Sequence, residues 1–424
     1  MKHTVPVTKL VEQIGPQIED MVSAIEACVH CGFCLPTCPT YQVLSEEMDS
    51  PRGRIFLMKS VLEGELNYQE VMPYIDQCLG CMACVTSCPS GVQYGELVLP
   101  FRVYAQSQIE HTVTDRLKRK LINETLPYPN RFRSAASLGL MSKPLLTVMP
   151  KRMQDVLALL PERLPETETL PELVHAQGNR RARVALLTGC VQQVFAQQIN
   201  WATIRVLVRN GVEVVIPSKQ VCCGALSIHT SNTDQARQFA RVNFSVFPDD
   251  VDAILTNAAG CGSGMKEYPL LFKGMEDEPR AQEFTNKVQD VSEFLDNLGL
   301  RETPVMSDSI KVAYHDACHL AHAQGITSAP RNLIASISNV SLLEVPQGEI
   351  CCGSAGTYNL EHPEIANELG KRKVDNILEI GPDVVVTGNI GCIVQIQSHL
   401  GTNGNSMPVY HTFELLDKAY LDES

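Results

Sequence analysis

Apolar and polar positions follow the same order twice in the second half of the chain. Each copy has a short apolar run, a helical stretch, a second apolar run that leads into Cys-Cys-Gly, another helical stretch and a third apolar run. The matched segments are VALLTGC (184–190) with VAYHDAC (312–318), VVIPSKQVCCG (214–224) with LEVPQGEICCG (343–353), and AILTNAAGC (253–261) with VVVTGNIGC (384–392). Strands that alternate with helices are typical of parallel sheets covered by helices. The pattern therefore predicts two repeated α/β domains, with cysteines at the carboxyl ends of strands, where such folds place their sites.

The first part of the chain has a different pattern. Short stretches with helical spacing, such as GRIFLMKSVLEG at 53–64, separate runs of cysteines, and alternating β-branched residues are scarce. We therefore predict a multi-domain α+β chain in which a mainly helical domain precedes the two α/β Cys-Cys-Gly domains. The expected units are a helical domain (1–110), a basic, proline-rich connector (111–180), a first Cys-Cys-Gly domain (181–300) and a second one (301–424).

The composition narrows the classes of function. The chain has 424 residues, 44% of them hydrophobic, and a formal net charge of −13. An acidic chain lacks the clustered Lys and Arg that phosphate contacts need, so we expect no nucleic-acid partner. The first twenty residues lack the apolar core of a signal peptide, and no run of 18 apolar residues occurs, so we expect a cytoplasmic protein. The sixteen cysteines then indicate metal binding or redox chemistry rather than disulfides.

Eight of the cysteines form two copies of one spacing. Each copy reads Cys-x-x-Cys-x-x-Cys-x-x-x-Cys-Pro, beginning at Cys28 and at Cys78. In two-cluster ferredoxins three close cysteines bind one [4Fe–4S] cubane, and the fourth binds the other cubane. This rule assigns Cys28, Cys31, Cys34 and Cys88 to cluster 1, and Cys38, Cys78, Cys81 and Cys84 to cluster 2. The alternative is structural zinc, but a closed zinc tetrahedron does not require a distant fourth cysteine followed by proline. We therefore expect the helical domain to be a two-cluster ferredoxin-type domain.

Two arginines follow the first run of cysteines, in Pro51-Arg52-Gly53-Arg54. One interpretation is a helix start with two solvated arginines. The alternative is that their charges raise the potential of cluster 1 or contact a partner.

The remaining eight cysteines form two matched quartets. They are Cys190, Cys222, Cys223 and Cys261 in the first repeat, and Cys318, Cys351, Cys352 and Cys392 in the second. Adjacent cysteines do not pair easily with each other, because a vicinal disulfide is strained. Four thiols match the ligand number of a cubane or of tetrahedral zinc. A further cluster, a zinc ion and redox-active thiols are the alternatives for each quartet.

Polar side chains flank Cys318. His315 and His319 have the i, i+4 spacing that would place them on one helix face, and Asp316 and His322 lie in the same segment. We expect His315 and His319 to support the site without binding its metal. The alternative is a role as a metal ligand or proton relay.

The Cys-Cys-Gly repeats resemble a domain shared by heterodisulfide reductase subunits and by several hydroxyacid and glycerol-phosphate dehydrogenase subunits. The motif of that family ends in Cys-x-x-Cys, whereas the residues after Cys261 and Cys392 include no such fifth cysteine. Its absence argues against the disulfide-reducing chemistry of the heterodisulfide reductases.

Over nearly its whole length the chain resembles the iron–sulfur subunits of glycolate oxidase, a flavin-dependent glycolate dehydrogenase. The stretches that carry the resemblance are ACVHCGFCLPTCPTYQVL (27–44), DSPRGRIFLMKSVLEGE (49–65), CLGCMACVTSCPSGVQYGEL (78–97), GCGSGMKEY (260–268), ICCGSAGTY (350–358) and NIGC (389–392). The resemblance implies that FAD on separate partner subunits oxidises glycolate to glyoxylate. It also implies that this subunit, which is not catalytic alone, passes electrons from the flavin towards the quinone pool at the inner face of the cytoplasmic membrane.

Other functions fit the same features. The nearest alternatives are the equivalent iron–sulfur subunits for lactate or glycerol-3-phosphate oxidation. A Cys-Cys-Gly thiol/disulfide reductase with its own active site is an alternative of a different class.

The connector has a charge opposite to that of the whole chain. Residues 115–152 contain nine Lys or Arg and only two acids, together with a series of Leu, Met and Val residues. Basic residues beside apolar ones suit helices that lie on an anionic lipid surface, which predicts peripheral membrane contact. The alternative is a basic linker that packs on the acidic rest of the chain or on the flavoprotein.

Overall fold

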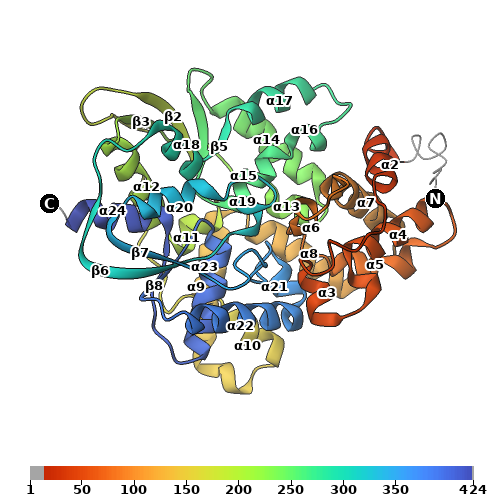
Figure 1. Cartoon of the computed structure of the whole chain (residues 1–424). Helices are drawn as coiled ribbons and strands as arrows, with labels where there is room; N and C mark the ends of the chain where they lie inside the picture. The colour runs from red at the N-terminus through yellow and green to blue at the C-terminus, as the bar shows by residue number, and fades with distance from the viewer. Residues whose placement is uncertain (1–13, 423–424) are drawn as a thin grey trace.

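A computed structural model describes residues 14–422 of the chain. The N-terminal helices, red and orange in Figure 1, lie on one side of the molecule, and the two α/β repeats form most of the rest. The helices of the N-terminal domain are α2 (Ile18–Glu26), α3 (Pro39–Leu44), η1 (Glu47–Asp49), α4 (Pro51–Leu62), α5 (Tyr68–Asp76), α6 (Ala83–Thr86) and α7 (Tyr94–Gln108). The predicted fold class, a helical region followed by two α/β regions, is confirmed.

Local signals determine where two of these helices begin. Pro51 opens α4, and the hydroxyl of Ser50 accepts a hydrogen bond from the amide of Gly53. α5 opens with a capping box in which Asn67 and Glu70 each accept a bond from the other's backbone amide. Such caps satisfy amides that have no partner within the helix. Because α5 ends two residues before Cys78, its fixed position also fixes the start of the second run of cysteines.

Each repeat contains one sheet. The four strands of the second sheet have the same order as the last four of the first sheet, which carries the additional edge strand β1. The order is β1–β3–β2–β4–β5 in the first sheet and β7–β6–β8–β9 in the second. The strands are β1 (Leu173–Val174), β2 (Ala182–Leu187), β3 (Val212–Val215), β4 (Ala253–Thr256), β5 (Val288–Asp290), β6 (Val305–Tyr314), β7 (Ser338–Glu344), β8 (Val384–Thr387) and β9 (Val409–His411). All neighbours are parallel except β1, which pairs antiparallel with β3. The continuous apolar runs follow from this topology, because helices cover both faces of a parallel sheet.

Helices surround both sheets. In the first repeat they are α11 (Val191–Phe195), α12 (Gln198–Arg209), α13 (Ala225–His229), α14 (Thr233–Val246), α15 (Ala259–Lys266), α16 (Tyr268–Leu271), α17 (Glu278–Asn286) and α18 (Val291–Leu298). In the second repeat they are α19 (Cys318–Ala321), α20 (Ser328–Ala335), α21 (Tyr358–Glu361), α22 (Pro363–Glu379), α23 (Ile390–Thr402) and α24 (Thr412–Asp422).

The last helix of each repeat packs against a helix of the other repeat. The last helix of the second repeat, α24, packs against α12 of the first, and the last helix of the first repeat, α18, packs against α20 of the second. Arg205 of α12 binds the carboxylate of Asp417 of α24, with Nε–Oδ1 at 2.9 Å and Nη2–Oδ2 at 2.5 Å. One apolar core, which includes the fully buried Val184, Val312 and Phe413, spans both sheets. The two repeats therefore pack as one unit, in which the last helix of each repeat covers part of the other repeat.

The backbone explains the glycine of each Cys-Cys-Gly motif. Gly224 and Gly353 have φ angles of +82° and +90°, which residues with side chains rarely adopt. A Cβ atom on Gly224 would lie 3.2 Å from Cα of Ala236 in α14. A Cβ atom on Gly353 would lie 2.6 Å from the carbonyl oxygen of Ala366 in α22. Each cysteine pair is thus held against a helix by a turn that requires glycine.

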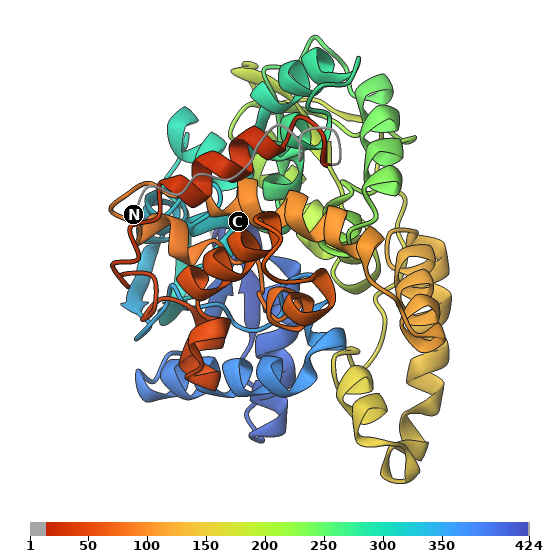
Figure 2. The ribbon, with the colours of Figure 1, turned by 90° about the vertical axis from the view of Figure 1, so that its right-hand side faces the viewer.

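The connector is mainly helical. It contains α8 (Val113–Thr125), α9 (Pro129–Ser142), η2 (Lys143–Val148) and α10 (Lys151–Ala158), which we call the helical arm (113–158). These orange and yellow elements run along one edge of the molecule in Figure 2. The arm is attached to the repeats, since the rings of Phe132 and Phe195 pack with centroids 4.9 Å apart. Within residues 14–422, no helix combines the length and apolar character needed to cross a membrane.

The glycine geometry predicts a graded loss of stability. Gly353→Ala should lower the free energy of unfolding by about 2–5 kcal/mol, because a strained φ is combined with a steric overlap. Gly381→Ala is the matched control, since Gly381 has φ +58° but open space around its Cβ position, and it should cost only about 1–2 kcal/mol. Urea unfolding followed by circular dichroism measures both values. Equal losses would show that the contact with α22 is unimportant.

Candidate metal centres and the cavities beside them

The first predicted cluster set converges on one cavity. Cys28, Cys31, Cys34 and Cys88 all line it, together with Cys84. Cys31 is exposed, and the neighbouring Val29 and Phe33 are each 65% exposed, so this cavity lies at the molecular surface. Gly32 has φ +88°, and its Cβ position would lie 2.8 Å from Nη1 of Arg52. Position 32 therefore requires glycine because Arg52 packs against the loop. The four thiols surround a cavity, as the binding of a cubane requires.

The second predicted set also comes together, deeper in the domain. Cys84 interacts electrostatically with Cys81, Cys78 and Cys38, and burial raises the pKa of both Cys81 and Cys84. Cys78 differs from them. Burial acts to raise its pKa, but the charges of Arg54 and Arg102, together with hydrogen bonds from the Gly80 amide and the Tyr94 hydroxyl, hold the pKa below its ordinary value. Because Cys84 also lines the first cavity, the two sets are direct neighbours.

Arg54 is fully buried, so the interpretation of two solvated arginines is wrong for this residue. Its guanidinium donates to the carbonyl oxygen of Tyr74 at 2.8 Å, to Oγ1 of Thr40 at 2.9 Å and to Oδ1 of Asp49 at 3.0 Å. Thr40 Oγ1 in turn lies 3.2 Å from Sγ of Cys38. The arginine therefore places a positive charge beside the second set, whereas Arg52 lies beside the first and donates to the carbonyl oxygen of His30.

The two quartets of the repeats face a common cavity of about 130 Å³. Within them Sγ of Cys222 lies 3.4 Å from Sγ of Cys190, and Sγ of Cys351 lies 3.8 Å from Sγ of Cys318. Seven of the eight quartet cysteines line this inter-repeat cavity, namely Cys190, Cys223, Cys261, Cys318, Cys351, Cys352 and Cys392. The loops that follow β4 and β8 join beside it, where the amide of Ala259 donates to the carbonyl oxygen of Gly388 at 3.1 Å.

Each quartet favours one thiolate. Hydrogen bonds from Cys222 and Cys261 lower the pKa of Cys223 well below its ordinary value. Cys351 and Cys392 do the same for Cys352, with a smaller contribution from His315. The second cysteine of each Cys-Cys pair is therefore the more acidic thiol, and a thiolate is the form that binds metals or reacts as a nucleophile.

The second cluster set touches the inter-repeat cavity. Nε2 of His319 lies 3.2 Å from the carbonyl oxygen of Gly80, within the Cys78–Cys81 loop. The ring of His319 stacks on that of His229, with centroids 5.4 Å apart. Cys81 also interacts electrostatically with Cys318. The structure thus places the ferredoxin-type cysteines directly beside the repeat cysteines. His229, which stacks on His319 at this junction, is a residue that the sequence analysis missed.

The four polar residues around Cys318 have different environments. Asp316 binds Arg331 through two contacts of 2.7 Å, and His322 lies 2.8 Å from Oγ1 of Thr86 through Nδ1. His315 is fully buried. The expectation that His315 and His319 share a helix face is wrong, because His315 directly follows β6 and α19 begins only at Cys318.

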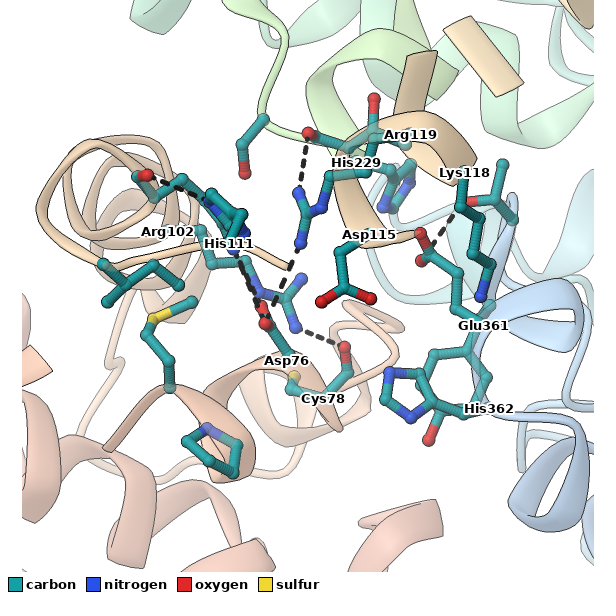
Figure 3. A pocket seen from close by; sticks show the side chains of 18 of the residues that line it. Asp76, Cys78, Arg102, His111, Asp115, Lys118, Arg119, His229, Glu361 and His362 are labelled. Carbon is teal, nitrogen blue, oxygen red and sulfur yellow. Dashed lines mark hydrogen bonds and ion pairs between the residues drawn. The ribbon is translucent and has the colours of Figure 1, made fainter. Parts of the chain in front are cut away.

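A separate cavity of about 320 Å³ lies beside Cys78, between α5, α7, α8 and α21 (Figure 3). Its charged lining mixes Arg102, Lys118 and Arg119 with Asp76, Asp115 and Glu361. Burial raises the pKa of Asp76 and of Glu361. Burial also lowers the pKa of His362, on the same wall, to about 4. We call this space the α8 cavity.

Comparison with known proteins identifies the domains that contain these cysteines. A 4Fe-4S dicluster domain matches residues 24–92, and a cysteine-rich domain matches residues 184–266 and 312–397. These matches define an iron–sulfur electron-transfer protein whose dicluster domain, with its eight cysteines, implies two [4Fe–4S] clusters.

Whole-chain relatives identify the family. The glycolate oxidase iron-sulfur subunit of Escherichia coli is 36% identical over 95% of both chains. The probable glycolate oxidase iron-sulfur subunit of Bacillus subtilis is 35% identical over 92% of this chain and 93% of that one. Lactate utilization protein A of Oceanobacillus iheyensis is 30% identical but spans only 55% of this chain. The chain belongs to the family of glycolate oxidase iron–sulfur subunits, and such a subunit works with partner subunits in an oxidoreductase complex.

The arginine placement predicts selective shifts of reduction potential. Arg102→Met should lower the potential of cluster 2 by several tens of millivolts, because a nearby positive charge favours the reduced, more negative cluster. Arg52→Met is the matched control and should lower the potential of cluster 1 instead. Redox titration monitored by EPR separates the two signals. A shift of the same signal in both variants would contradict this assignment of arginines to clusters.

Proposed function

We propose that this chain is the electron-transfer subunit of a flavin-dependent glycolate dehydrogenase, which passes electrons from FAD on partner subunits towards quinone. Cluster 1 is assigned to Cys28, Cys31, Cys34 and Cys88, and cluster 2 to Cys38, Cys78, Cys81 and Cys84. Bound [4Fe–4S] clusters would supply one-electron transfer. The observation that carries the proposal is the series of adjacent thiol sets, which runs from the exposed Cys31 to the buried Cys81.

The protein residues would control this transfer through charge and position. Arg54 and Arg102 provide positive charge beside Cys78, and Arg102 donates to the carbonyl oxygen of Cys78 at 2.5 Å. The exposed Val29 and Phe33 surround Cys31, so a partner can approach the first set closely. Entry of electrons at the first set and exit from the second is the direction that this burial supports.

Glycolate is preferred over lactate because of the extent of similarity. The relatives named for glycolate oxidase span more than nine-tenths of the chain, whereas the named lactate utilization protein spans little more than half. The equivalent subunit of a lactate-oxidising complex is the second candidate. Dye reduction by the reconstituted complex with each hydroxyacid distinguishes them.

We predict that the purified chain alone does not oxidise glycolate, because the flavin belongs to partner subunits. Adding the flavoprotein subunits should restore transfer of electrons from glycolate to a quinone analogue. Cys28→Ala should abolish that transfer but leave direct dye reduction by the flavoprotein unchanged. Robust turnover by the chain without flavoprotein would refute the proposed role.

The α8 cavity supports a quinone as the acceptor. Cys78 lines it, and the protonatable side chains of Glu361 and His111 lie on its walls, which suits an acceptor that takes up two protons with two electrons. α8 forms one wall through Asp115 and Lys118. A lipid-soluble acceptor would need this cavity to lie close to a membrane.

The helical arm supports such a location. Among the described residues, seventeen large hydrophobic side chains are exposed, and nine of these lie in the arm. They are Val113, Leu117, Leu121, Leu138, Met141, Leu145, Val148, Met153 and Val156. The first three are spaced by four residues, so they form an apolar stripe along α8. A helix with an apolar stripe and basic residues suits an anionic lipid surface. We therefore propose peripheral membrane contact through the arm.

The structure also shows which basic residues of the arm have other roles. Lys143 donates to the carbonyl oxygen of Leu160 at 2.9 Å, and Arg131 pairs with Glu124 at 2.6 Å. Substituting these would disturb the arm itself, so the apolar stripe gives the cleaner test.

Replacing Leu117 and Leu121 by Ser should weaken co-sedimentation of the complex with anionic vesicles about tenfold, because two partly inserted leucines are removed. Iron content should not change, since both side chains are 66% exposed. Val242→Ser with Met275→Ser is the control, because these exposed residues lie outside the arm. If both double variants bind vesicles as the parent does, the arm is not the anchor.

A further inference from the structure

His315 is an unusual side chain for the interior of a protein. Its exposed fraction is 0%, and neither Nδ1 nor Nε2 has a nitrogen or oxygen partner within hydrogen-bond distance in the part of the chain that the structure describes. The polar groups beside the ring are thiols, those of Cys352 and Cys392. Buried polar groups are nearly always paired, because an unpaired one loses its bonds to water without compensation. A buried imidazole with no nitrogen or oxygen partner, set against two thiols, therefore needs a physical explanation.

The surroundings of His315 provide one. A nitrogen of its ring and the Sγ atoms of Cys352 and Cys392 all lie within 4.8 Å of one another, and all three residues are buried. In a tetrahedral metal site, bonds of about 2.3 Å to sulfur and 2.0–2.1 Å to nitrogen place the ligand atoms roughly 3.5–3.8 Å apart. The three atoms thus need to move only slightly to hold one ion.

The first repeat shows that the fold itself does not require this histidine. Alignment of VAYHDAC with VALLTGC places Leu187 at the position of His315. Leu187 is also buried, with 1% of its surface exposed. It is the last residue of β2, and His315 directly follows the last residue of β6, so both lie at the carboxyl end of the corresponding strand. The first repeat therefore fills the position with an apolar side chain, and the imidazole is a feature of the second repeat alone.

We propose that His315, Cys352 and Cys392 bind one metal ion of the zinc or iron(II) type, in a mononuclear site with mixed nitrogen and sulfur ligands. Imidazole and thiolate are ligands that such ions share. The site goes beyond the electron-transfer role, because it gives the second repeat a nitrogen ligand for a metal ion that the first repeat, with Leu187 at that position, does not offer. It also replaces the expectation that His315 only supports the cysteines.

The test compares the full-length protein with two variants, all purified without oxygen. His315→Leu introduces the residue that the first repeat already carries, and Cys392→Ala removes a different member of the triad. Zinc, iron and acid-labile sulfide are measured for each protein. Both variants should lose about one zinc or iron ion per chain, with sulfide and the EPR signals of the two ferredoxin-type clusters unchanged.

X-ray absorption at the edge of the lost metal gives a second readout. The parent should show the outer-shell scattering of one imidazole, and His315→Leu should lack it. His322→Leu, which removes an imidazole at the end of α19 that is not part of the triad, should keep both the ion and the imidazole scattering. Unchanged metal content in His315→Leu, a matching loss of sulfide, or a parent with no metal beyond about eight cluster irons would overturn the proposal.

Discussion

The contact between the Cys78–Cys81 loop and the second repeat joins the ferredoxin-type domain to the cysteine quartets of the repeats. Here the carbonyl oxygen of Gly80 meets His319, the hydroxyl of Tyr358 donates to the carbonyl oxygen of Gln77, and Cys81 shares an apolar cluster with Cys318. Gly80 has φ +68°, and its Cβ position lies 3.5 Å from the ring of His229, so the loop and the histidines are closely fitted. Without this contact the ferredoxin-type cysteines would not lie beside the cysteines of the repeats.

Electrostatics accounts for much of the arrangement around that contact. Closely spaced buried thiols repel one another once they ionise, and burial alone raises their pKa. At Cys78 two arginines counter this effect, and in the quartets hydrogen bonds among neighbouring thiols concentrate ionisation on Cys223 and Cys352. The chain thus uses buried cations in one domain and sulfur–sulfur hydrogen bonds in the other to reach the same result, a thiolate available for a metal.

Local and periodic features of the sequence predicted the elements well. The cysteine spacing and the repeated apolar runs each depend only on residues close together in the sequence. They therefore indicate the helical domain and the parallel sheets. Features that depend on contacts between segments far apart in the sequence could not be predicted from it. The sequence leaves open whether Arg54 is solvated or acts on a cluster, and its partners Thr40 and Tyr74, which come from other elements, enclose it. His229 reaches the loop of Gly80 only through tertiary packing. The i, i+4 rule failed for His315 and His319 because it presupposes a helix, and β6 extends to Tyr314.

The reciprocal packing of α24 on α12 and of α18 on α20 has an evolutionary consequence. Two copies of one domain that cover each other in this way correspond to a symmetric homodimer, in which the same surface is used twice. In such a dimer any residue near the shared cavity must appear in both copies. Joining the copies in one chain removes that obligation, so Leu187 and His315 could diverge while the strand order and the Cys-Cys-Gly turns stayed the same. Fusion thereby turns a twofold-symmetric pocket into one with two chemically distinct halves.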